Sequence, residues 1–534
     1  MSIEKVLVFA FLLSRNIVLG TTRIDPLVDT KVGLIRGLAA SDGEYSMFMG
    51  IPYATVDKEI PFGPSIPHPV FDEIFEAYDD SAICPQTEEF NNTIVGTLDC
   101  LHLNIYVPNT ATSQNRRPVL VWIYGGGFSI GFAGRFLYGP RFLVRHNIIL
   151  VTLNYRVGPY GFMCLDIDKV PGNQGLKDQL LALKWIKNNI EAFGGDPNQI
   201  TIFGESAGGV SVDLQLYYND ETLFNKVIMQ SGSASSTWAV TEPDYTYPVK
   251  LANELNFVTT DINEALTFLS TVETNLVISA AAKLGRLAPC VEKIFDGVER
   301  FITDYPINIQ PKMQNIPVLL GFNKDEWLSK YAFLEPEDYE RLDIFNSYMK
   351  TLFINEDYET FANVVKQFYI GDEPISDKVM WRLIEFDSDD YFIHPAVRSI
   401  PKYIENGASN VYYYKFSYDG NRNFVKDRVN ITIAGVAHAD EISYLFDVSY
   451  MRDEPSSKDQ YIIDAMTMMW ANFAKYGNPT PEINNLLPVK WEPATSEMMY
   501  CLEIDSELKM LNRPLNDRMA FWDILYKQRT TTRY

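Results

Sequence analysis

Basic residues and long apolar runs are both scarce in this chain of 534 residues, which carries 46 Lys and Arg against 69 Asp and Glu. The net charge of −23 weighs against binding to nucleic acid or to an anionic membrane surface, because both favour basic patches. Beyond the N-terminus no apolar run is long enough for a membrane helix, and the final residues, TTTRY, match no retention or anchor signal. The composition therefore predicts a soluble acidic protein without a membrane anchor.

Motifs for metals and cofactors are also absent from the sequence. It contains no H-E-x-x-H or C-x-x-C spacing for a metal and no G-x-G-x-x-G loop for a dinucleotide. We therefore expect neither a metal nor a cofactor. Repeats, low-complexity tracts and long Pro/Gly/Ser linkers are absent as well, so we expect residues 21–534 to form a single domain. The sequence indicates no particular oligomeric state.

The first segment, residues 1–20, has the features of a secretory signal peptide. A basic residue precedes the apolar run Val6–Leu13, and Gly20 stands at a suitable small-residue cleavage site. The run is too short to span a bilayer, and a buried N-terminal strand is the alternative. We expect the segment to be removed and the mature protein to be secreted to the extracellular space. Two acceptor sequons, at Asn91 and Asn430, fit a glycoprotein.

Only five cysteines are present, and secretion would allow them to pair. Cys84 and Cys100 bracket a polar loop, and a disulfide that closes it would stabilise the fold by about 3 kcal/mol on the chain-entropy model. The remaining cysteines are isolated in the sequence, and we expect them to be buried free thiols: Cys164, Cys290 and Cys501.

The pattern of apolar residues predicts an α/β fold. RPVLVWIY (117–124) and NIILVTLNY (147–155) are nearly continuous apolar runs of strand length, typical of parallel strands that are covered on both faces. Leucine and isoleucine at helical spacing between residues 176 and 190 predict a helix before the strand QITIF (199–203). Strand, helix and strand in this order imply a parallel sheet. We expect the mostly helical segment from about 240 to 405 to be an insertion over this sheet.

The pattern G-x-S-x-G occurs twice, around Ser129 and around Ser206, so the pattern alone does not identify a nucleophile. Ser206 follows the buried strand QITIF and precedes the helical stretch AGGVSVDLQLYY. A nucleophile elbow needs this arrangement, in which glycines two residues before and after the serine let the strand and the helix approach each other. No helical apolar period follows Ser129. Ser206 is therefore the predicted nucleophile.

The glycines Gly125, Gly126 and Gly127, directly after the strand RPVLVWIY, can supply the donors that a serine nucleophile requires. Without Cβ atoms, their backbone N–H groups can point at a developing oxyanion. The N–H of Ala207, at the start of the helix after Ser206, is a further donor. A flexible turn is the alternative for the glycines, but their position upstream of an elbow favours an oxyanion hole.

The chain offers only five histidines as a general base. His438 lies on a predicted loop between a strand and a helix, downstream of the serine. This position matches the chain order Ser, acid, His of enzymes with a nucleophile elbow. The others lie in a strand, in polar surface-like segments or in a weaker context: His102, His68, His146 and His394. Asp325 and Glu326, after the strand-like IPVLLGFN, are both possible acids. Asp440 and Glu441 are expected to cap the following helix.

Together these segments resemble those of the type-B carboxylesterase and cholinesterase family. The resemblance is strong from about residue 31 to 235, through GIPYA, CLHLNIYVP, YGGGF, NYRVGPYGF and FGGDPNQITIFGESAGG, and it continues in GFNKDE, HADEISYLF and KYGNPTP. It implies the α/β-hydrolase fold, a large, mostly parallel central sheet flanked by helices, with helical insertions over the active site. It also implies a catalytic triad and an oxyanion hole, formed respectively by Ser206, Glu326 and His438 and by the N–H groups of Gly126, Gly127 and Ala207.

The sequence departs from the family pattern at several positions. Trp327 replaces the usual glycine after the acid, and Tyr124 stands where many members have His. Trp238 matches the aromatic position of the acyl pocket, although an ordinary core tryptophan is the alternative. The bridge Cys84–Cys100 also matches the family, whereas the family's second bridge has no cysteine pair here.

The segment TVDKEIPFGPSIPHPVFDEIFEAYDD looks most like the secreted esterases of insects. The resemblance implies a secreted serine carboxylesterase that hydrolyses small lipophilic esters, such as xenobiotics, odorants or pheromones, through an acyl-enzyme. The loop from Cys84 to Cys100 lacks a tryptophan for cation–π contact with choline, which weighs against choline esters. A dedicated juvenile hormone esterase is the alternative, although Glu205 stands where Gln is typical of that role. A non-catalytic adhesion protein is a third reading, disfavoured because every triad position is filled.

We predict that an organophosphate will label Ser206, because only this serine has the strand before it and the helix after it that form an elbow. The mass of the proteolytic peptide that contains residue 206 should rise by the mass of the phosphoryl adduct. A label on the peptide that contains Ser129 would reverse the choice between the two serines.

Overall fold

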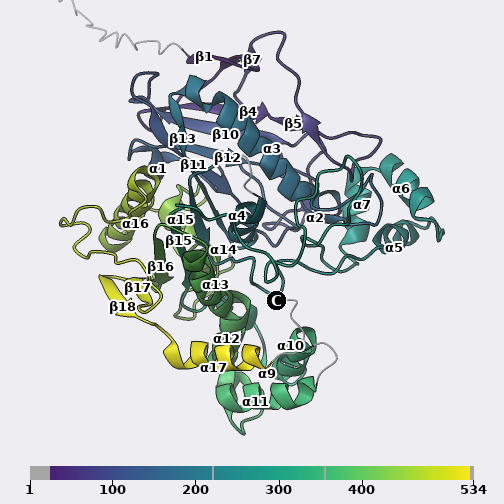
Figure 1. Cartoon of the computed structure of the whole chain (residues 1–534), viewed down its shortest axis with the longest axis vertical. Coiled ribbons are helices and arrows are strands. Elements are labelled where there is room, and N and C mark those ends of the chain that lie inside the picture. The colour runs from purple at the N-terminus through teal and green to yellow at the C-terminus, as the bar shows by residue number, and fades with distance from the viewer. Residues whose placement is uncertain (1–24, 219–221, 354–356, 529–534) are drawn as a thin grey trace, which may run out of the picture.

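Figure 1 shows the computed structural model, which describes residues 25–218, 222–353 and 357–528 of the chain. The predicted signal peptide, residues 1–20, lies outside these residues. An 11-stranded sheet dominates the structure. Its strands, in chain order, are β3 (Leu38–Ala39), β4 (Tyr45–Pro52), β10 (His102–Pro108), β11 (Arg117–Ile123), β12 (Ile149–Leu153), β13 (Gly195–Glu205), β14 (Lys226–Gln230), β15 (Val318–Asn323), β16 (Val411–Phe416), β17 (Tyr500–Ile504) and β18 (Leu508–Asn512).

The order of strands across this sheet is β18-β17-β16-β15-β14-β13-β11-β12-β10-β4-β3. The central run from β12 to β17 pairs in parallel, and the strands at both edges pair antiparallel. The predicted, mostly parallel sheet is therefore confirmed. Smaller sheets lie outside it and contain β1 (Leu27–Thr30), β2 (Gly33–Arg36) and β7 (Phe75–Glu76), β5 (Ala54–Thr55) and β6 (Ile66–Pro67), and β8 (Gln86–Thr87) and β9 (Ile94–Val95).

Helices flank the sheet and extend beyond it (Figure 1). Those up to the middle of the chain are α1 (Arg141–Val144), α2 (Gly158–Phe162), α3 (Gln174–Asn189), η1 (Ile190–Phe193), α4 (Ala207–Tyr218), α5 (Tyr247–Glu254), α6 (Ile262–Thr271) and α7 (Thr274–Ala281). The later ones are α8 (Leu328–Tyr331), α9 (Pro336–Tyr339), α10 (Ile344–Leu352), α11 (Tyr358–Ile370), η2 (Asp377–Val379), α12 (Met380–Ser388), the π-helix η3 (Asp389–Ile393), α13 (His394–Glu405), α14 (Phe424–Arg428), α15 (Ile442–Leu445), α16 (Ser457–Tyr476) and α17 (Asn516–Lys527). No helix in the described ranges is long and apolar enough to cross a membrane.

The central strands are covered on both faces. Residues 119–123, 149–153 and 200–205 are all buried, although successive side chains of a strand point to opposite faces. Helices α3 and α4 pack against β13, and α1 and α16 pack against each other beside β11 and β12. The apolar runs quoted from the sequence are therefore the buried centre of the sheet.

The segment predicted as a helical insertion, about 240–405, divides in two. Helices α5 to α7 form a group at one side of the molecule, in which α7 contacts α2, and α10 to α12 form another group with α17 at the far end (Figure 1). Between the two groups the chain returns to the sheet as β15, which pairs with β14 and β16. Only the helical parts therefore lie outside the sheet.

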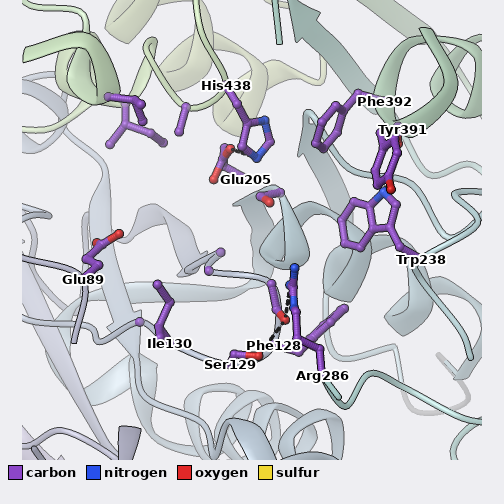
Figure 2. A pocket seen from close by; sticks show the side chains of 18 of the residues that line it. Glu89, Phe128, Ser129, Ile130, Glu205, Trp238, Arg286, Tyr391, Phe392 and His438 are labelled. Atoms are coloured by element: carbon purple, nitrogen blue, oxygen red, sulfur yellow. Dashed lines mark hydrogen bonds and ion pairs between the residues drawn. The ribbon is translucent and has the colours of Figure 1, made fainter. Parts of the chain in front are cut away.

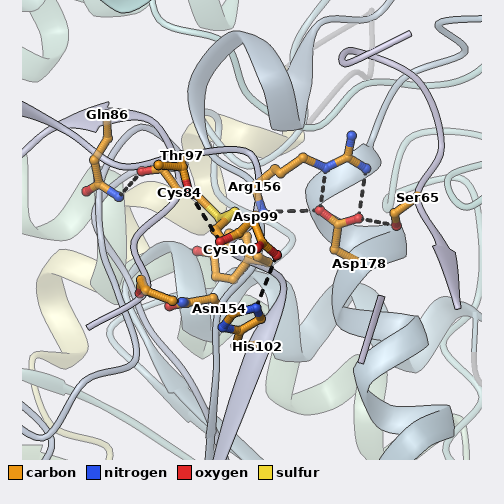
Figure 3. Close-up of a disulfide and its surroundings, with 12 residues drawn as sticks. Ser65, Cys84, Gln86, Thr97, Asp99, Cys100, His102, Asn154, Arg156 and Asp178 are labelled. Carbon is orange, nitrogen blue, oxygen red and sulfur yellow. Dashed lines mark hydrogen bonds and ion pairs between the residues drawn. A yellow bond between two sulfur atoms is a disulfide. The ribbon is translucent and has the colours of Figure 1, made fainter. Parts of the chain in front are cut away.

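The structure contains two disulfides among the described cysteines. Cys84 is bonded to Cys100, the pair that the sequence indicated, and Figure 3 shows this bridge beside Gln86. Cys164 is bonded to Cys290, so the expectation of free thiols is wrong for these two residues. They lie 126 residues apart, and only the packing of the loop after α7 against the segment after α2 brings them together. Cys501 is buried and free, as expected.

We predict that peptide mapping without reduction will recover the pairs Cys84–Cys100 and Cys164–Cys290 as linked peptides, each separated by reduction. Cys501 should react with an alkylating agent only after unfolding, because it is buried in the sheet. Recovery of Cys164 or Cys290 as an alkylated free thiol from the unfolded, unreduced protein would contradict this pairing.

Candidate active site

Ser206 lies at the turn between β13 and α4, in a left-handed backbone conformation with φ of 57°. The turn is tight because its glycines allow close contacts. A Cβ added at Gly208 would lie only 2.0 Å from the carbonyl oxygen of Ile123, and one at Gly204 would lie 2.6 Å from the same oxygen. The N–H of Ser206 donates to the carbonyl of Gln230 at 2.8 Å, which ties the turn to β14. The structure therefore holds this serine in a strained conformation that surrounding contacts enforce.

Ser129, the serine of the second G-x-S-x-G pattern, lies in a different setting. Its hydroxyl donates to the carbonyl of Gly127 at 3.3 Å, and its N–H donates to the carbonyl of Gly126 at 3.1 Å. The next helix, α1, begins only at Arg141. This serine is part of a compact turn and is not followed by a helix, so it forms no elbow.

His438 and Glu326 are directly hydrogen-bonded. Nδ1 of His438 lies 2.6 Å from Oε2 of Glu326, and the N–H of His438 donates to the carbonyl of Glu326 at 2.9 Å. Glu326 is fully buried, and its Oε1 accepts from the hydroxyl of Ser231 at 2.6 Å and from the N–H of Asn323 at 2.7 Å. A carboxylate held in this way fixes the orientation of the imidazole and favours the tautomer with its proton on Nδ1.

The structure distinguishes Asp325 from Glu326, the two carboxylates that spacing alone left equivalent. Oδ2 of Asp325 accepts from the N–H of Val436 at 3.1 Å, and the N–H of Asp325 donates to the carbonyl of Val436 at 2.9 Å. Asp325 therefore fastens the loop that precedes His438, whereas Glu326 contacts the imidazole itself. Polar residues at the carboxyl ends of β14 and β15, Ser231 and Asn323, were not singled out from the sequence, although parallel strands end at one common edge.

Asp440 and Glu441 do not cap the helix that follows them. The N-terminus of α15 has no side-chain cap, and Oδ1 of Asp440 instead accepts from the first N–H groups of α14, at 2.9 and 3.0 Å. Glu441 is buried and accepts from the side-chain amides of Gln230, at 2.9 Å, and Asn323, at 2.6 Å. The expectation was wrong because tertiary contacts supply these carboxylates with better-placed donors than a one-turn helix offers.

A further carboxylate, Glu205, lies at the other nitrogen of the imidazole (Figure 2). Its Oε1 is 3.1 Å from Nε2 of His438. Burial raises the pKa of Glu205 to about 8, although the charge of His438 opposes the shift. Burial by itself lowers the pKa of His438, but the carboxylates of Glu205 and Glu326 outweigh this and raise it to about 9. The imidazole thus lies between two groups that favour its protonated form.

The glycine loop after β11 passes next to the serine. A Cβ added at Gly125 would lie 2.9 Å from Cβ of Ser206. Gly126 and Gly127 have φ of 99° and 59°, which favour glycine. Within the described ranges, the N–H groups of Gly126, Gly127 and Ala207 donate to no acceptor of the protein. Unpaired backbone donors beside a serine can bind the oxygen of a tetrahedral intermediate.

The glycine loop, Ser206, Glu205 and His438 line one cavity of about 680 Å³. Figure 2 shows Trp238, Tyr391 and Phe392 together on one side of it, and Glu89 on the opposite side. The ring of Phe392 stacks on the imidazole of His438 with 4.3 Å between centroids. Nε1 of Trp238 donates to the carbonyl of Tyr391 at 3.0 Å, which orients the indole in the cavity wall. Trp238 therefore lines the cavity and packs against Phe392, the ring that contacts the imidazole.

The opposite wall carries a charge pair. Glu89, from the loop between Cys84 and Cys100, forms an ion pair with Arg428 at the end of α14. The guanidinium of Arg428 also lies over the ring of Phe424, 5.4 Å from its centroid. The carboxylate on this side of the cavity is therefore neutralised by a neighbouring cation.

The remaining histidines do not line this cavity. Each contacts another partner: His68 the carbonyl of Pro69, His102 the carboxylate of Asp99, His146 the hydroxyl of Thr467, and His394 the carboxylate of Asp523. In the part of the chain that the structure describes, no group of three or more His, Cys, Asp and Glu residues is arranged to hold a metal ion.

Comparison with known proteins now assigns the family. The family model described as "Carboxylesterase family" matches residues 24–522. The chain belongs to the carboxylesterase family. It is therefore a carboxylic-ester hydrolase with the α/β-hydrolase fold.

Relatives of this carboxylesterase include esterases of different names. It is 32% identical over 502 residues to a juvenile hormone esterase of Heliothis virescens, with 88% of each chain covered. It is 32% identical over 501 residues to esterase FE4 of Myzus persicae, with 87% of each chain covered. The crystal structure of the juvenile hormone esterase of Manduca sexta with OTFP covalently attached matches with a TM-score of 0.83 at 27% identity, over 94% of this chain and 100% of that one. The similarity thus extends over nearly the whole hydrolase.

We predict that Glu205→Gln will shift the acidic limb of the pH profile of this carboxylesterase to lower pH. With His438 as the predicted base, which must be neutral to accept a proton, we expect activity to be lost as the pH falls through the pKa of this histidine. Removing the charge of Glu205 removes one of the groups that raise this pKa. The acidic limb of kcat/KM should therefore move down by about 1 unit. An unchanged limb, or one that moves to higher pH, would contradict this account of the pair.

Proposed function

We propose that this carboxylesterase is a serine hydrolase with Ser206 as nucleophile, His438 as general base and Glu326 as the orienting acid. The hydrogen-bonded pair of Glu326 and His438, in the cavity that Ser206 lines, carries the proposal. The N–H groups of Gly126, Gly127 and Ala207 form the proposed oxyanion hole. Their lack of an acceptor in the described structure supports this role.

Catalysis would proceed by two acyl transfers. His438 takes the proton of Ser206 through Nε2 while the hydroxyl oxygen attacks the ester carbonyl. The oxyanion hole binds the resulting negative charge, and His438 then protonates the leaving alcohol. Water repeats the sequence on the acyl-enzyme and releases the acid. Glu326 keeps the proton on Nδ1 in place and stabilises the imidazolium in both halves of the reaction.

We propose lipophilic esters, such as xenobiotics, odorants or pheromones, as the substrate class. The aromatic wall formed by Trp238, Tyr391 and Phe392 supports this, because it offers apolar contact close to the imidazole. We assign the acyl group of the ester to the side of Trp238. Choline esters are disfavoured because the carboxylate of Glu89, on the opposite wall, already pairs with Arg428.

A dedicated juvenile hormone esterase is the second candidate. The relatives of that name in Heliothis virescens and Manduca sexta support it. Esterase FE4 is equally identical to this chain, however, so identity does not favour one role over the other. Glu205 is the specific feature against a dedicated hormone esterase. The named relatives are esterases and lend no support to the non-catalytic adhesion protein.

We also propose that the mature protein, residues 21–534, is a secreted glycoprotein that acts as a single domain. The family match over residues 24–522 supports the single domain. The two disulfides suit an oxidising compartment. The sequon residues Asn91 and Asn430 are exposed, so both could carry a glycan.

We expect Ser206→Ala to lower kcat for an aryl acetate by roughly 10⁴-fold or more, while the protein keeps its unfolding temperature. Ser113→Ala, at an exposed serine in the loop before β11, is the matched control and should keep normal turnover.

In a panel of aryl, aliphatic, terpenoid and choline esters, the neutral apolar esters should give at least a tenfold higher kcat/KM than the choline ester.

Near-normal turnover by Ser206→Ala would refute the nucleophile. A preference for the choline ester would leave the nucleophile in place but refute the substrate class. A preference restricted to the terpenoid ester would favour the hormone esterase.

A further inference from the structure

The carbonyl of Gly127 is held by two side chains from different parts of the chain. Nη2 of Arg286 donates to this oxygen at 2.6 Å, and the hydroxyl of Ser129 donates to it at 3.3 Å. Figure 2 shows the guanidinium of Arg286 reaching the backbone beside Phe128 and Ser129. Ser129 and Arg286 therefore both contact one residue of the proposed oxyanion hole, and Arg286 was not predicted from the sequence.

The contact between Arg286 and Gly127 depends on the absence of a side chain at position 127. A Cβ there would lie 1.6 Å from Nη2 of Arg286. Arg286 forms no ion pair in the described structure, although it lines the cavity. Arg286 is exposed to solvent on one side, and desolvation by the surrounding protein lowers the pKa of its guanidinium. Its well-defined protein contact is thus the backbone of the glycine loop, and no carboxylate competes for it.

The loop that carries Arg286 is fastened just beyond it. Cys290 is bonded to Cys164, and the side chain of Asn173 exchanges hydrogen bonds with the N–H and the carbonyl of Cys290, at 2.9 and 2.8 Å. The carbonyl of Pro289 accepts from the N–H of Thr241 at 2.8 Å. These contacts fix the chain within four residues of the guanidinium.

A second anchor follows at Glu292. Its buried carboxylate forms an ion pair of 2.5 Å with Lys177 of α3, and it accepts from the N–H of Ile302 at 3.0 Å. On the other side, Gly285 has no heavy atom within 4 Å of the position that a Cβ would take. Upstream, the N–H groups of Lys283 and Leu284 donate to carbonyls at the end of α7, at 3.1 and 3.0 Å. Arg286 therefore lies between this helix and the anchors at Cys290 and Glu292.

We propose that Arg286 is a positioning residue for the oxyanion hole, and that the Cys164–Cys290 disulfide determines where its guanidinium lies. Consecutive glycines have wide conformational freedom, and donors of an oxyanion hole stabilise a transition state only when they are already oriented. The N–H of Gly127 shares a peptide plane with the carbonyl of Gly126, which accepts from the N–H groups of Ser129 and Ile130 at 3.1 and 3.2 Å. Arg286 holds the following plane through the carbonyl of Gly127, so both peptide planes that meet at this glycine are fixed. The inference rests on the proposed serine mechanism.

The test compares Arg286→Met, Arg286→Lys and the wild-type protein with p-nitrophenyl acetate. Arg286→Met should lower kcat at least tenfold and change KM less than threefold, because the donors act on the transition state and not on the bound ester. Arg286→Lys should recover part of kcat, and added guanidinium ion should raise kcat of Arg286→Met only. Lys283→Met is the control, since this exposed lysine of the same loop pairs with Glu254 instead.

Normal kcat in Arg286→Met would overturn the inference, and so would a rise in KM alone, which would make Arg286 a substrate contact. Ser206→Ala is measured beside it. If Ser206→Ala is inactive while Arg286→Met is normal, only the inference fails. If Ser206→Ala is active, the proposed function fails and the inference with it.

The disulfide is tested by a double-mutant cycle. Removing both sulfurs, in Cys164→Ser with Cys290→Ser, should lower kcat in the same manner as Arg286→Met, and the two changes combined should lower it less than their product. Asn173→Gly, which removes only the hydrogen bonds to Cys290 and tolerates the φ of 57° at that position, is the milder variant if the serine variant does not fold. If the two losses of kcat multiply in the combined variant, the disulfide acts independently of Arg286, and that part of the inference is overturned.

Discussion

The turn from β13 into α4 depends on a contact between backbones that only glycine permits. A Cβ at Gly204 of β13 or at Gly208 of α4 would collide with the carbonyl of Ile123 in β11. Ser206 is held between them at positive φ, and its N–H is tied to Gln230 of the neighbouring strand. The glycine loop after β11 and the polar residues after β14 and β15 surround this turn, because parallel strands end at one edge of the sheet. The geometry of the whole site thus follows from this contact.

Buried carboxylates determine the charge state of the site. Glu326 and Glu205 contact opposite nitrogens of His438, and Glu441 lies behind them, held by the amides of Asn323 and Gln230. Burying several carboxylates is unfavourable unless hydrogen bonds or an opposite charge compensate. Here the hydroxyl and amide donors and the imidazole provide that compensation. The carboxylates in turn raise the pKa of the imidazole, so their burial and the protonation of His438 are linked in this cavity.

Much of the fold could be predicted because its signals are local. The buried strands and the helix α3 follow from runs and spacings of apolar residues, and those runs coincide with β11, β12 and β13. The division of the helical insertion by β15 could be anticipated only in part, because a short apolar run does not show which sheet it joins. The capping of α14 by Asp440 could not be predicted, since the donors come from a segment about fifteen residues earlier.

The sequence by itself indicated the family, through the resemblance of several motifs that occur in order. It also indicated the elbow at Ser206, from spacing within one segment, and the scarcity of alternatives to His438, from a count of histidines. Spacing along the chain did not distinguish Asp325 from Glu326, which the family resemblance favoured, and only the tertiary structure shows that Glu326 is the one that contacts His438. It also decided the pairing of Cys164 with Cys290 and the contact of Arg286 with Gly127. Both depend on the packing of loops that lie far apart in the chain. Spacing along the sequence does not show which of these loops come into contact.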